Sequence, residues 1–504
     1  MSAIGDAIYS ILKDSEGLTA RRMVRALSPL GYKVDKAQVN SILYSSPVFR
    51  RDESTPPRWF LSASRSIPKS RPAPHRLLGI AVQNWKAFAD VRALLAGVTL
   101  VYGENSSGKS SIFQAMLLLK QSWGYGEVQF EGALGSFGWY QHVVHRHDMD
   151  RDIRFIAHWG AEEPDEFWSV HVDLPHGPAD GGYEPQHPIG RITCFGPERA
   201  VTIVPWGEDG EWLLVPIDEG LGPGVDPVES LRDQVVFVAA DERGFPDVSQ
   251  VRRAQEVPGS RPDRSVERTV ELVSDALDGA RAMLDSIEHI GPSRPLPERD
   301  ISLDWAKANA QYLARLFAEP DLVLEVNEWL VRFDVPYQVE ITWYGEDEGD
   351  QQFSLDLNRR GGMGEKVQLR DVGFGVSQLL PIIVQLLGSR EKTILIEEPE
   401  AHVHPRLQSV LGDLMVTSSQ DYGNVLVVET HSEPILLRLQ RRIAEGRLDH
   451  DDAAVMHVIR RGEASEIEPV PIQDNGQLDY QWPGGFFDDR MDDLVAILDP
   501  RPDE

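Results

Sequence analysis

The sequence lacks the features that mark secreted and membrane-spanning proteins. Its 504 residues include a single cysteine, Cys194, which excludes an intramolecular disulfide and any cysteine-cluster metal site. Nothing resembles a signal peptide, and no apolar run approaches the roughly 20 residues that span a bilayer. A long heptad pattern is also missing, which excludes extended coiled-coil arms. We therefore expect a cytoplasmic protein without a membrane partner, long enough for two or three domains.

Negative charge predominates, but it is unevenly distributed along the chain. The formal net charge is −30, whereas residues 1–71 contain 12 Lys/Arg against 6 Asp/Glu. This asymmetry indicates a basic module attached to an acidic body. A segment rich in Ser, Pro and basic residues follows the module and is typical of a linker. We therefore predict an N-terminal domain at 1–64, a linker at 65–76 and the main body from residue 77.

One glycine-rich segment has the spacing of a phosphate-binding loop. Residues 103–110 match G-x-x-x-x-G-K-[ST] between a predicted strand, Val98–Val101, and a predicted helix, Ser110–Gln121. Backbone N–H groups and the positive end of a helix dipole converge at such a junction and bind phosphate. We expect Lys109 to reach the β- and γ-phosphates and Ser110 to bind Mg²⁺. The predicted nucleotide contacts of this loop are Gly103, Asn105, Ser106, Ser107, Gly108, Lys109, Ser110 and Ser111.

Acidic and histidine residues follow two further predicted strands. Glu397 and Glu398 come directly after Lys392–Ile396, at the strand end where ligands bind in open parallel sheets. We assign Glu397 to the metal and Glu398 to activation of the attacking water. His431 follows Val425–Val428 and is suited to sense the γ-phosphate. The alternatives are a charged strand-to-helix turn for the two glutamates and a helix-capping or solvated histidine.

These motifs together resemble the ABC-type P-loop ATPases of the SMC, RecF and overcoming-lysogenization-defect (OLD) group. The resemblance extends over about residues 77–500 and rests on the segments 103–111, 396–405 and 429–432, with weaker landmarks at 84–88, 118–122, 291–295 and 482–488. It implies ATP and Mg²⁺ as cofactors. It also implies an α/β fold, an ABC-type head with a mixed or parallel sheet and a large α+β insertion. A small N-terminal winged helix-turn-helix domain is predicted separately, from the pattern of that module.

In that family two ATPase heads sandwich two ATP molecules, so the resemblance implies a homodimer or a higher oligomer. Each signature loop then reaches the nucleotide of the opposite head. The corresponding residues here are Gly373, Gly375 and Ser377, with Gly373 in place of the usual serine. The glutamine loop, which binds the metal in relatives, is assigned to Gln141.

The N-terminal module is predicted to be a winged helix. Three helical segments precede a hairpin at Phe49–Leu61, and Lys36, Asn40 and Tyr44 share one face of the third. Together with Pro56, Pro57 and Trp59 they resemble the contact surface of Z-alpha domains, which grip left-handed duplexes. The alternative is a protein-binding winged helix in which Tyr44 and Trp59 are core aromatics.

The middle and the end of the chain are less informative. We predict an ATPase domain at 77–440 with an insertion at about 125–345, and a C-terminal tail subdomain at 441–504. The first half of the insertion is expected to be β-rich, and its second half to contain helices near Ser265–Glu288 and Leu303–Phe317. Arg294 and Arg299 are candidates for phosphate or nucleic-acid contacts, with a surface role as the alternative.

Three functions remain open on the sequence. The first is an ATPase switch controlled by a nucleic-acid-sensing winged helix, acting in defence against phage or foreign DNA with a separate effector protein. The second is an ATP-regulated nuclease, although the acidic run near residue 490 lacks the arrangement of a TOPRIM domain. The third is a scaffold that binds ATP without turnover and docks a protein through its winged helix.

Overall fold

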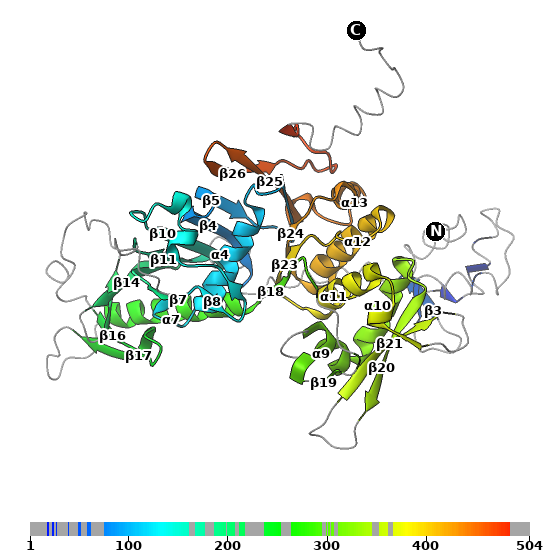
Figure 1. The fold of residues 1–504 in the computed structure, drawn as a ribbon, viewed down its shortest axis with the longest axis horizontal. Helices are drawn as coiled ribbons and strands as arrows, with labels where there is room; N and C mark the ends of the chain where they lie inside the picture. The colour runs from blue at the N-terminus through cyan, green and yellow to red at the C-terminus, as the bar shows by residue number, and fades with distance from the viewer. Residues whose placement is uncertain are drawn as a thin grey trace, which may run out of the picture. The chain divides into compact units, whose positions relative to one another are not determined.

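The structure is a computed structural model of a chain that divides into two compact units, Met1–Arg71 and Pro72–Glu504 (Figure 1). The division falls within the segment predicted as a linker. In the second unit the structure describes residues 75–160, 167–176, 186–197, 199–206, 211–216, 236–253, 264–294, 299, 301–302, 304–306, 311–344, 352–360 and 366–483. In the first unit it describes residues 18–19, 23–24, 27, 39, 49–51 and 58–61.

The first unit contains a small antiparallel sheet, β1 (Leu18–Thr19), β3 (Arg58–Leu61) and β2 (Phe49–Arg51) in that order. Pairing of β2 with β3 confirms the predicted hairpin. Met23, Leu27 and Val39 are fully buried. Trp59 lies in β3 through its backbone, whereas five other predicted contacts lie outside the described residues: Lys36, Asn40, Tyr44, Pro56 and Pro57. The winged helix and its nucleic-acid surface therefore stay predictions.

The second unit is built on a six-stranded sheet with the order β18-β23-β24-β6-β25-β26. The first five strands are parallel and β26 is antiparallel to β25. The predicted strands at 98–101, 392–396 and 425–428 are confirmed as β6, β23 and β24. The strands are β18 (Ile287–Ile290), β23 (Thr393–Glu397), β24 (Val425–Glu429), β6 (Val98–Gly103), β25 (Ala453–Arg461) and β26 (Ala464–Val470).

Both faces of this sheet are buried, because successive strand residues point to opposite faces and both sets are apolar. Leu100 of β6 packs in one hydrophobic core with Ile394 and Leu426, whereas the next residue, Val101, packs in the other core with Leu395. Continuous apolar runs such as Val-Leu-Val-Val are what a doubly covered parallel strand requires, which is why the sequence alone located these strands.

Helices cover the two faces. α11 (Phe374–Gly388), α12 (Pro405–Tyr422) and α13 (Glu433–Ala444) lie together on one side (Figure 1), and their apolar residues belong to the core that contains Leu100. α9 (Gln311–Ala318) and α10 (Pro320–Arg332) pack on α11. The opposite face carries α4 (Lys109–Ser122) and α7 (Arg264–Asp285). The helices predicted at 110–121 and near 265–288 are confirmed, and α9 covers the end of the one expected near 303–317.

A nine-stranded antiparallel sheet shares the core of α4 and α7. Its strand order is β17-β16-β15-β14-β13-β11-β10-β4-β5, which confirms the β-rich character predicted for about 125–245. The strands are β17 (Pro246–Arg253), β16 (Val236–Ala240), β15 (Glu211–Pro216), β14 (Ala200–Trp206), β13 (Arg191–Phe195), β11 (Phe167–Leu174), β10 (Ile153–Gly160), β4 (Leu77–Trp85) and β5 (Phe88–Leu94).

Smaller sheets complete the unit. Four strands, β19 (Ile301–Ser302), β21 (Gln352–Arg359), β20 (Tyr337–Tyr344) and β22 (Lys366–Gln368), form one of them. The pairs β7 (Glu127–Gln129) with β12 (Gln186–Pro188) and β8 (Glu131–Gly132) with β9 (Gly135–Ser136) form two others. The predicted boundaries at 125–345 and 441 stay predictions. Strand β18, inside the predicted insertion, and β25, inside the predicted tail, both belong to the central sheet.

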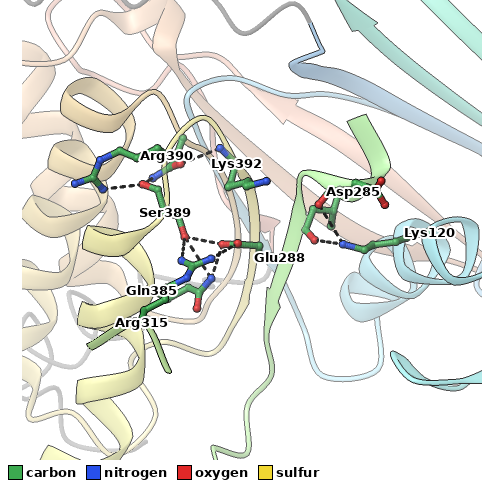
Figure 2. Close-up of polar contacts among 10 residues, drawn as sticks. Lys120, Asp285, Glu288, Arg315, Gln385, Ser389, Arg390 and Lys392 are labelled. Carbon is green, nitrogen blue, oxygen red and sulfur yellow. Dashed lines mark hydrogen bonds and ion pairs between the residues drawn. The ribbon is translucent and has the colours of Figure 1, made fainter. Parts of the chain in front are cut away.

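A buried polar cluster ties the helices to the sheet at the end where β18 and β23 begin (Figure 2). Glu288 of β18 accepts hydrogen bonds from Arg315 of α9 and Gln385 of α11, and from Ser389 Oγ at 2.5 Å. Lys120, near the end of α4, donates to the carbonyl oxygen of Ile287 at 2.5 Å. Pairing satisfies these buried charges, so the cluster fixes α4, α9 and α11 on the sheet.

Within the described residues, no helix combines the length and apolar character needed to cross a bilayer.

Candidate nucleotide-binding site

Three neighbouring strands end together at the edge of the central sheet. The register places Glu397, the last residue of β23, opposite Glu429 of β24, and Glu429 opposite Val101 of β6. Because the strands are parallel, the glycine-rich loop after β6 and the segments that follow Glu397 and Glu429 emerge side by side. Three sequence motifs, the first of them about three hundred residues before the other two, thus meet in one place.

Two glycines allow the loop to take its shape. An added Cβ at Gly103 would lie 2.5 Å from the carbonyl oxygen of Val458 in β25. Gly108 has φ +106°, in the left-handed region, and an added Cβ would lie 2.7 Å from the Cβ of Ala87. Any side chain would therefore push the loop from its neighbours, and at Gly108 it would also strain the backbone.

Lys109 is the first residue of α4 and is 4% exposed. Its ammonium group donates to the carbonyl oxygens of Gly103 at 3.0 Å and Glu104 at 2.8 Å, and Glu429 Oε1 lies 3.9 Å away. Burial lowers the pKa of Lys109, and the charges of Glu429, Glu398 and Glu400 act in the opposite direction. The ammonium group of Lys109 is thus hydrogen-bonded to the backbone of the loop in which it was predicted to bind phosphate.

Ser110 is paired with a carboxylate that the sequence reasoning did not assign. Its hydroxyl donates to Glu429 at 2.8 Å to Oε2 and 3.1 Å to Oε1. Glu429 is 5% exposed, and burial raises its pKa, assisted by the charges of Glu397 and Glu398 and opposed by Ser110 and Lys109. A signal was available: Glu429 ends a buried strand two residues before His431, as Glu397 ends β23.

The predicted carboxylate pair has two different environments. Glu397 Oε1 lies 2.7 Å from Nε2 of His289, in the neighbouring strand β18. Glu398 has φ +43°, unusual for a residue with a side chain, and its amide donates to the carbonyl oxygen of Glu429 at 2.8 Å. Glu398 is therefore held by its backbone at the end of β24, while Glu397 is held by its side chain.

Glu400 anchors the segment that carries His431. It accepts hydrogen bonds from the His431 amide at 2.6 Å and from Thr430 Oγ1 at 2.7 Å. Burial raises the pKa of Glu400, and those two bonds act against the rise. Burial and the charge of Lys109 lower the pKa of His431. The histidine thus follows β24 beside the phosphate loop, with its backbone fixed.

The other predicted loop residues lie between β6 and the first turn of α4. Asn105 and Ser106 are exposed, and Ser106 has φ +63°. The Ser107 amide donates to Glu104 O at 3.2 Å, and its side chain is buried. The Ser111 carbonyl accepts a 2.7 Å bond from the indole of Trp85 in β4. The helix end of the loop is thus bonded to β4, and its tip, Asn105 and Ser106, is exposed.

The remaining predicted residues lie elsewhere. Gln141 belongs to α5 (Tyr140–Val143), and its amide lies 3.4 Å from Nε2 of His142. Gly373 precedes α11 and is exposed, with open space around its Cα, whereas Ser377 is buried. No hydrogen bond or ion pair among the described side chains joins Gln141 to Ser110 or Glu429. The roles of these residues stay predictions.

A polar cavity of about 550 Å³ adjoins the phosphate loop. Ala87, whose Cβ faces Gly108, lines it together with Lys86, and its other walls include His145, Arg146, Arg460 and Glu463. Lys86 and Arg460 form no ion pair within the part of the chain that the structure describes, so the cavity has an excess of positive charge. Such a cavity suits a polar, anionic ligand.

Two parts of the chain match families. Residues 336–438 match the family described as "AAA domain, putative AbiEii toxin, Type IV TA system", and residues 448–497 match "Protein of unknown function (DUF3696)". No curated protein matches the chain significantly.

Solved structures show weak similarity. The "SMC head domain from Thermotoga maritima" is 12% identical, with 79% of this chain and 100% of that chain covered and a TM-score of 0.37. An Smc head domain with an extended coiled coil, bound to the C-terminal domain of ScpA derived from Pyrococcus furiosus, is 10% identical, with 84% and 99% covered and a TM-score of 0.40.

The parallel sheet, the glycine loop at the end of β6 and the acidic edge define a P-loop nucleotide-binding unit. The match to the AAA domain family covers α11, β23 and β24 of this unit and agrees with a P-loop ATPase.

Proposed function

We propose that the chain is a Mg²⁺-dependent ATP hydrolase of the ABC type. The observation that carries this proposal is the meeting of Lys109 and Ser110 with Glu397, Glu398 and Glu429 at one edge of the sheet. A serine hydroxyl and carboxylate oxygens are the hard ligands that Mg²⁺ prefers. Lys109 and the loop amides supply the positive field that a triphosphate needs.

Each residue has one part in the proposed reaction. Lys109 moves from the loop carbonyls to the β- and γ-phosphates, and Ser110 and Glu397 hold the metal. When bound there, Mg²⁺ would supply positive charge to neutralise the charge that develops on the transferred phosphoryl group. Glu398 orients the attacking water and accepts its proton, and the neutral ring of His431 donates a hydrogen bond toward the γ-phosphate.

The finer parts of the proposal rest on the sequence. Gly373 and Gly375 offer amides to the nucleotide of a second head in a homodimer, and Gln141 contributes to the metal site. Residues 1–64 bind nucleic acid and control the heads. The description of the matched family, which names a toxin and a TA system, supports a defence role with a separate effector protein.

ATP binding and steady-state hydrolysis by the full chain test the proposal. Lys109→Ala is expected to lose ATP binding. Glu398→Gln is expected to bind ATP and accumulate as a dimer, with hydrolysis lowered about a thousandfold, since the water activator is removed. Glu391→Gln, at the opposite end of β23, is the matched control and should behave as wild type. Undiminished turnover in Glu398→Gln would contradict the assignment, and ATP binding without turnover in the wild type would indicate a scaffold.

A further inference from the structure

Arg294 is a buried arginine beside the carboxylates of the site. It is 6% exposed, so the surface role considered from the sequence is wrong for this residue, whereas Arg299 is exposed and pairs with Asp371 at 2.9 Å. Burial lowers the pKa of Arg294, and the charges of Glu400, Glu398 and Glu397 counteract the fall. A buried guanidinium is costly unless it is paired, so its partners show what it does.

Its direct partners are backbone carbonyls. Arg294 Nη2 donates to the carbonyl oxygens of Glu397 at 2.9 Å and Glu398 at 3.2 Å. Its Nε and Nη1 are buried and have no hydrogen-bond partner among the described residues. The single nitrogen Nη2 therefore joins the carbonyl oxygens of two successive residues, Glu397 and Glu398.

The Glu397–Glu398 peptide is in an unusual conformation. Glu398 has φ +43°, and non-glycine residues with strained backbones persist only where surrounding contacts hold them. The Glu398 amide donates to Glu429 O, and its carbonyl accepts from Arg294 and from the Ala401 amide at 3.1 Å. The backbone of Glu398 is thus fixed on both sides, and Arg294 supplies the only charged group among these contacts.

Arg294 is itself fixed by α11. Gln378, which is 2% exposed, donates from Nε2 to the carbonyl oxygen of Arg294 at 2.9 Å. The predicted signature glycines lie one turn earlier, where α11 begins. The contacts therefore form a continuous path from the start of α11, through Gln378 and Arg294, to the peptide of Glu397 and Glu398.

We propose that Arg294 is a positioning residue for hydrolysis: by holding the Glu397–Glu398 peptide it keeps the Glu398 carboxylate at the place from which it activates water. The proposal rests on the proposed ATPase function. It differs from the sequence prediction for Arg294 because the side chain acts on the backbone of Glu397 and Glu398.

Two sets of measurements test this role. The first is hydrogen exchange of the peptide that spans residues 394–404, without nucleotide, in the wild type and Arg294→Lys. Lysine retains the charge, but its ammonium group ends one atom short of the position of Nη2, from which Arg294 reaches both carbonyls. Faster exchange at the amides of Glu398 and Ala401 is therefore expected. The second is kcat and ATP affinity, measured separately. Arg294→Lys should lower kcat about a hundredfold and change ATP affinity by less than about threefold.

Further variants separate positioning from folding. Arg294→Ala should regain part of its turnover when guanidinium is added, which a merely misfolded protein would not do. Gln378→Ala removes the support of Arg294 without touching the site and should lower kcat less, about tenfold. It replaces Arg294→Lys if that variant does not fold. Arg441→Ala, on the exposed side of α13, is the matched control and should equal the wild type.

The outcomes are distinct. Wild-type kcat in Arg294→Lys, unchanged exchange at residues 394–404, or equal losses of kcat and ATP affinity would each overturn the inference. If the wild type itself does not hydrolyse ATP, the proposed function fails, while the exchange measurement still decides whether Arg294 holds the Glu397–Glu398 peptide.

Discussion

The hydroxyl of Ser110 lies 2.8 Å from the carboxylate of Glu429, although the two residues are 319 positions apart in the chain. Strand β24 lies directly beside β6, so its last side chain reaches the first turn of α4. The carboxylate therefore stands where Ser110 would hold Mg²⁺, and Lys109 Nζ is 3.9 Å away. We therefore predict that Glu429 takes part in the proposed metal site.

Glu429→Gln should separate binding of the metal from binding of the nucleotide. Loss of one carboxylate should raise the Mg²⁺ concentration needed for ATP binding roughly tenfold or more. Removal of a negative charge close to the phosphates should strengthen Mg²⁺-free ATP binding roughly three- to tenfold. Titration of a fluorescent ATP analogue with and without Mg²⁺ measures both effects. Equal Mg²⁺ requirements in variant and wild type would exclude Glu429 from the metal site, and Glu391→Gln provides the control.

Protonation of His431 should make kcat fall on the acidic side of the pH–rate profile, which is called its acid limb below. Burial and Lys109 hold the pKa of His431 below its usual value, so the ring is neutral at pH 7 and becomes protonated only at a lower pH than a free histidine. We expect kcat to stay constant as the pH falls from neutral through the usual range of histidine titration, and to fall only at a more acidic pH. His431→Gln should lower kcat about a hundredfold and remove this limb. A limb that persists in His431→Gln would belong to another group.

Much of the site could be predicted from the sequence because its parts are local. Each strand is a continuous apolar run, as a doubly buried parallel strand must be, and each motif stands directly at the end of its strand. Glycine at positions 103 and 108 is required by contacts that any side chain would break. Recognising the strand therefore also locates the motif that follows it. The prediction that Lys109 and Ser110 lie at a strand–helix junction is confirmed.

The contacts of Glu429 and Arg294 depend on which strands are neighbours, and no local pattern records that order. Glu429 reaches Ser110 because β24 is inserted between β23 and β6, and His289 reaches Glu397 because β18 is parallel to β23. Arg294 lies 103 positions before Glu397, just beyond β18. Sequence reasoning placed Arg294 among phosphate-binding or surface residues because an isolated arginine gives no indication of its burial.

The N-terminal module should act as a sensor if the Z-alpha resemblance holds. We expect short left-handed duplexes to stimulate ATP hydrolysis by the full chain several-fold, and removal of residues 1–71 to abolish the stimulation while basal turnover remains. Asn40→Ala and Tyr44→Ala should have the same effect as the truncation. Binding through phosphates should weaken steeply with salt. Equal turnover with left-handed, B-form and single-stranded nucleic acid would instead favour a protein-docking module.

The C-terminal segment should support the phosphate loop through aromatic contacts. Trp482 packs edge-on against Tyr102 with ring centroids 5.6 Å apart, and Tyr102, the residue before Gly103, donates its hydroxyl proton to the carbonyl oxygen of Ser432 at 2.8 Å. Trp482 also lies 5.0 Å from His457, which bonds Tyr480 at 2.9 Å. One tryptophan therefore connects the C-terminal segment with the strand and the loop that flank the nucleotide.

Trp482→Ala should weaken both stability and nucleotide binding, because Tyr102 loses the ring that holds it beneath the loop. We expect the free energy of unfolding in urea to fall by about 1–3 kcal/mol, since the ring is only partly buried. ATP affinity should fall roughly three- to tenfold, corresponding to about 1 kcal/mol of lost loop support. Trp482→Phe keeps an edge-on ring and should recover most of both losses. If stability falls while ATP affinity is unchanged, the segment packs on β6 without any influence on the phosphate loop.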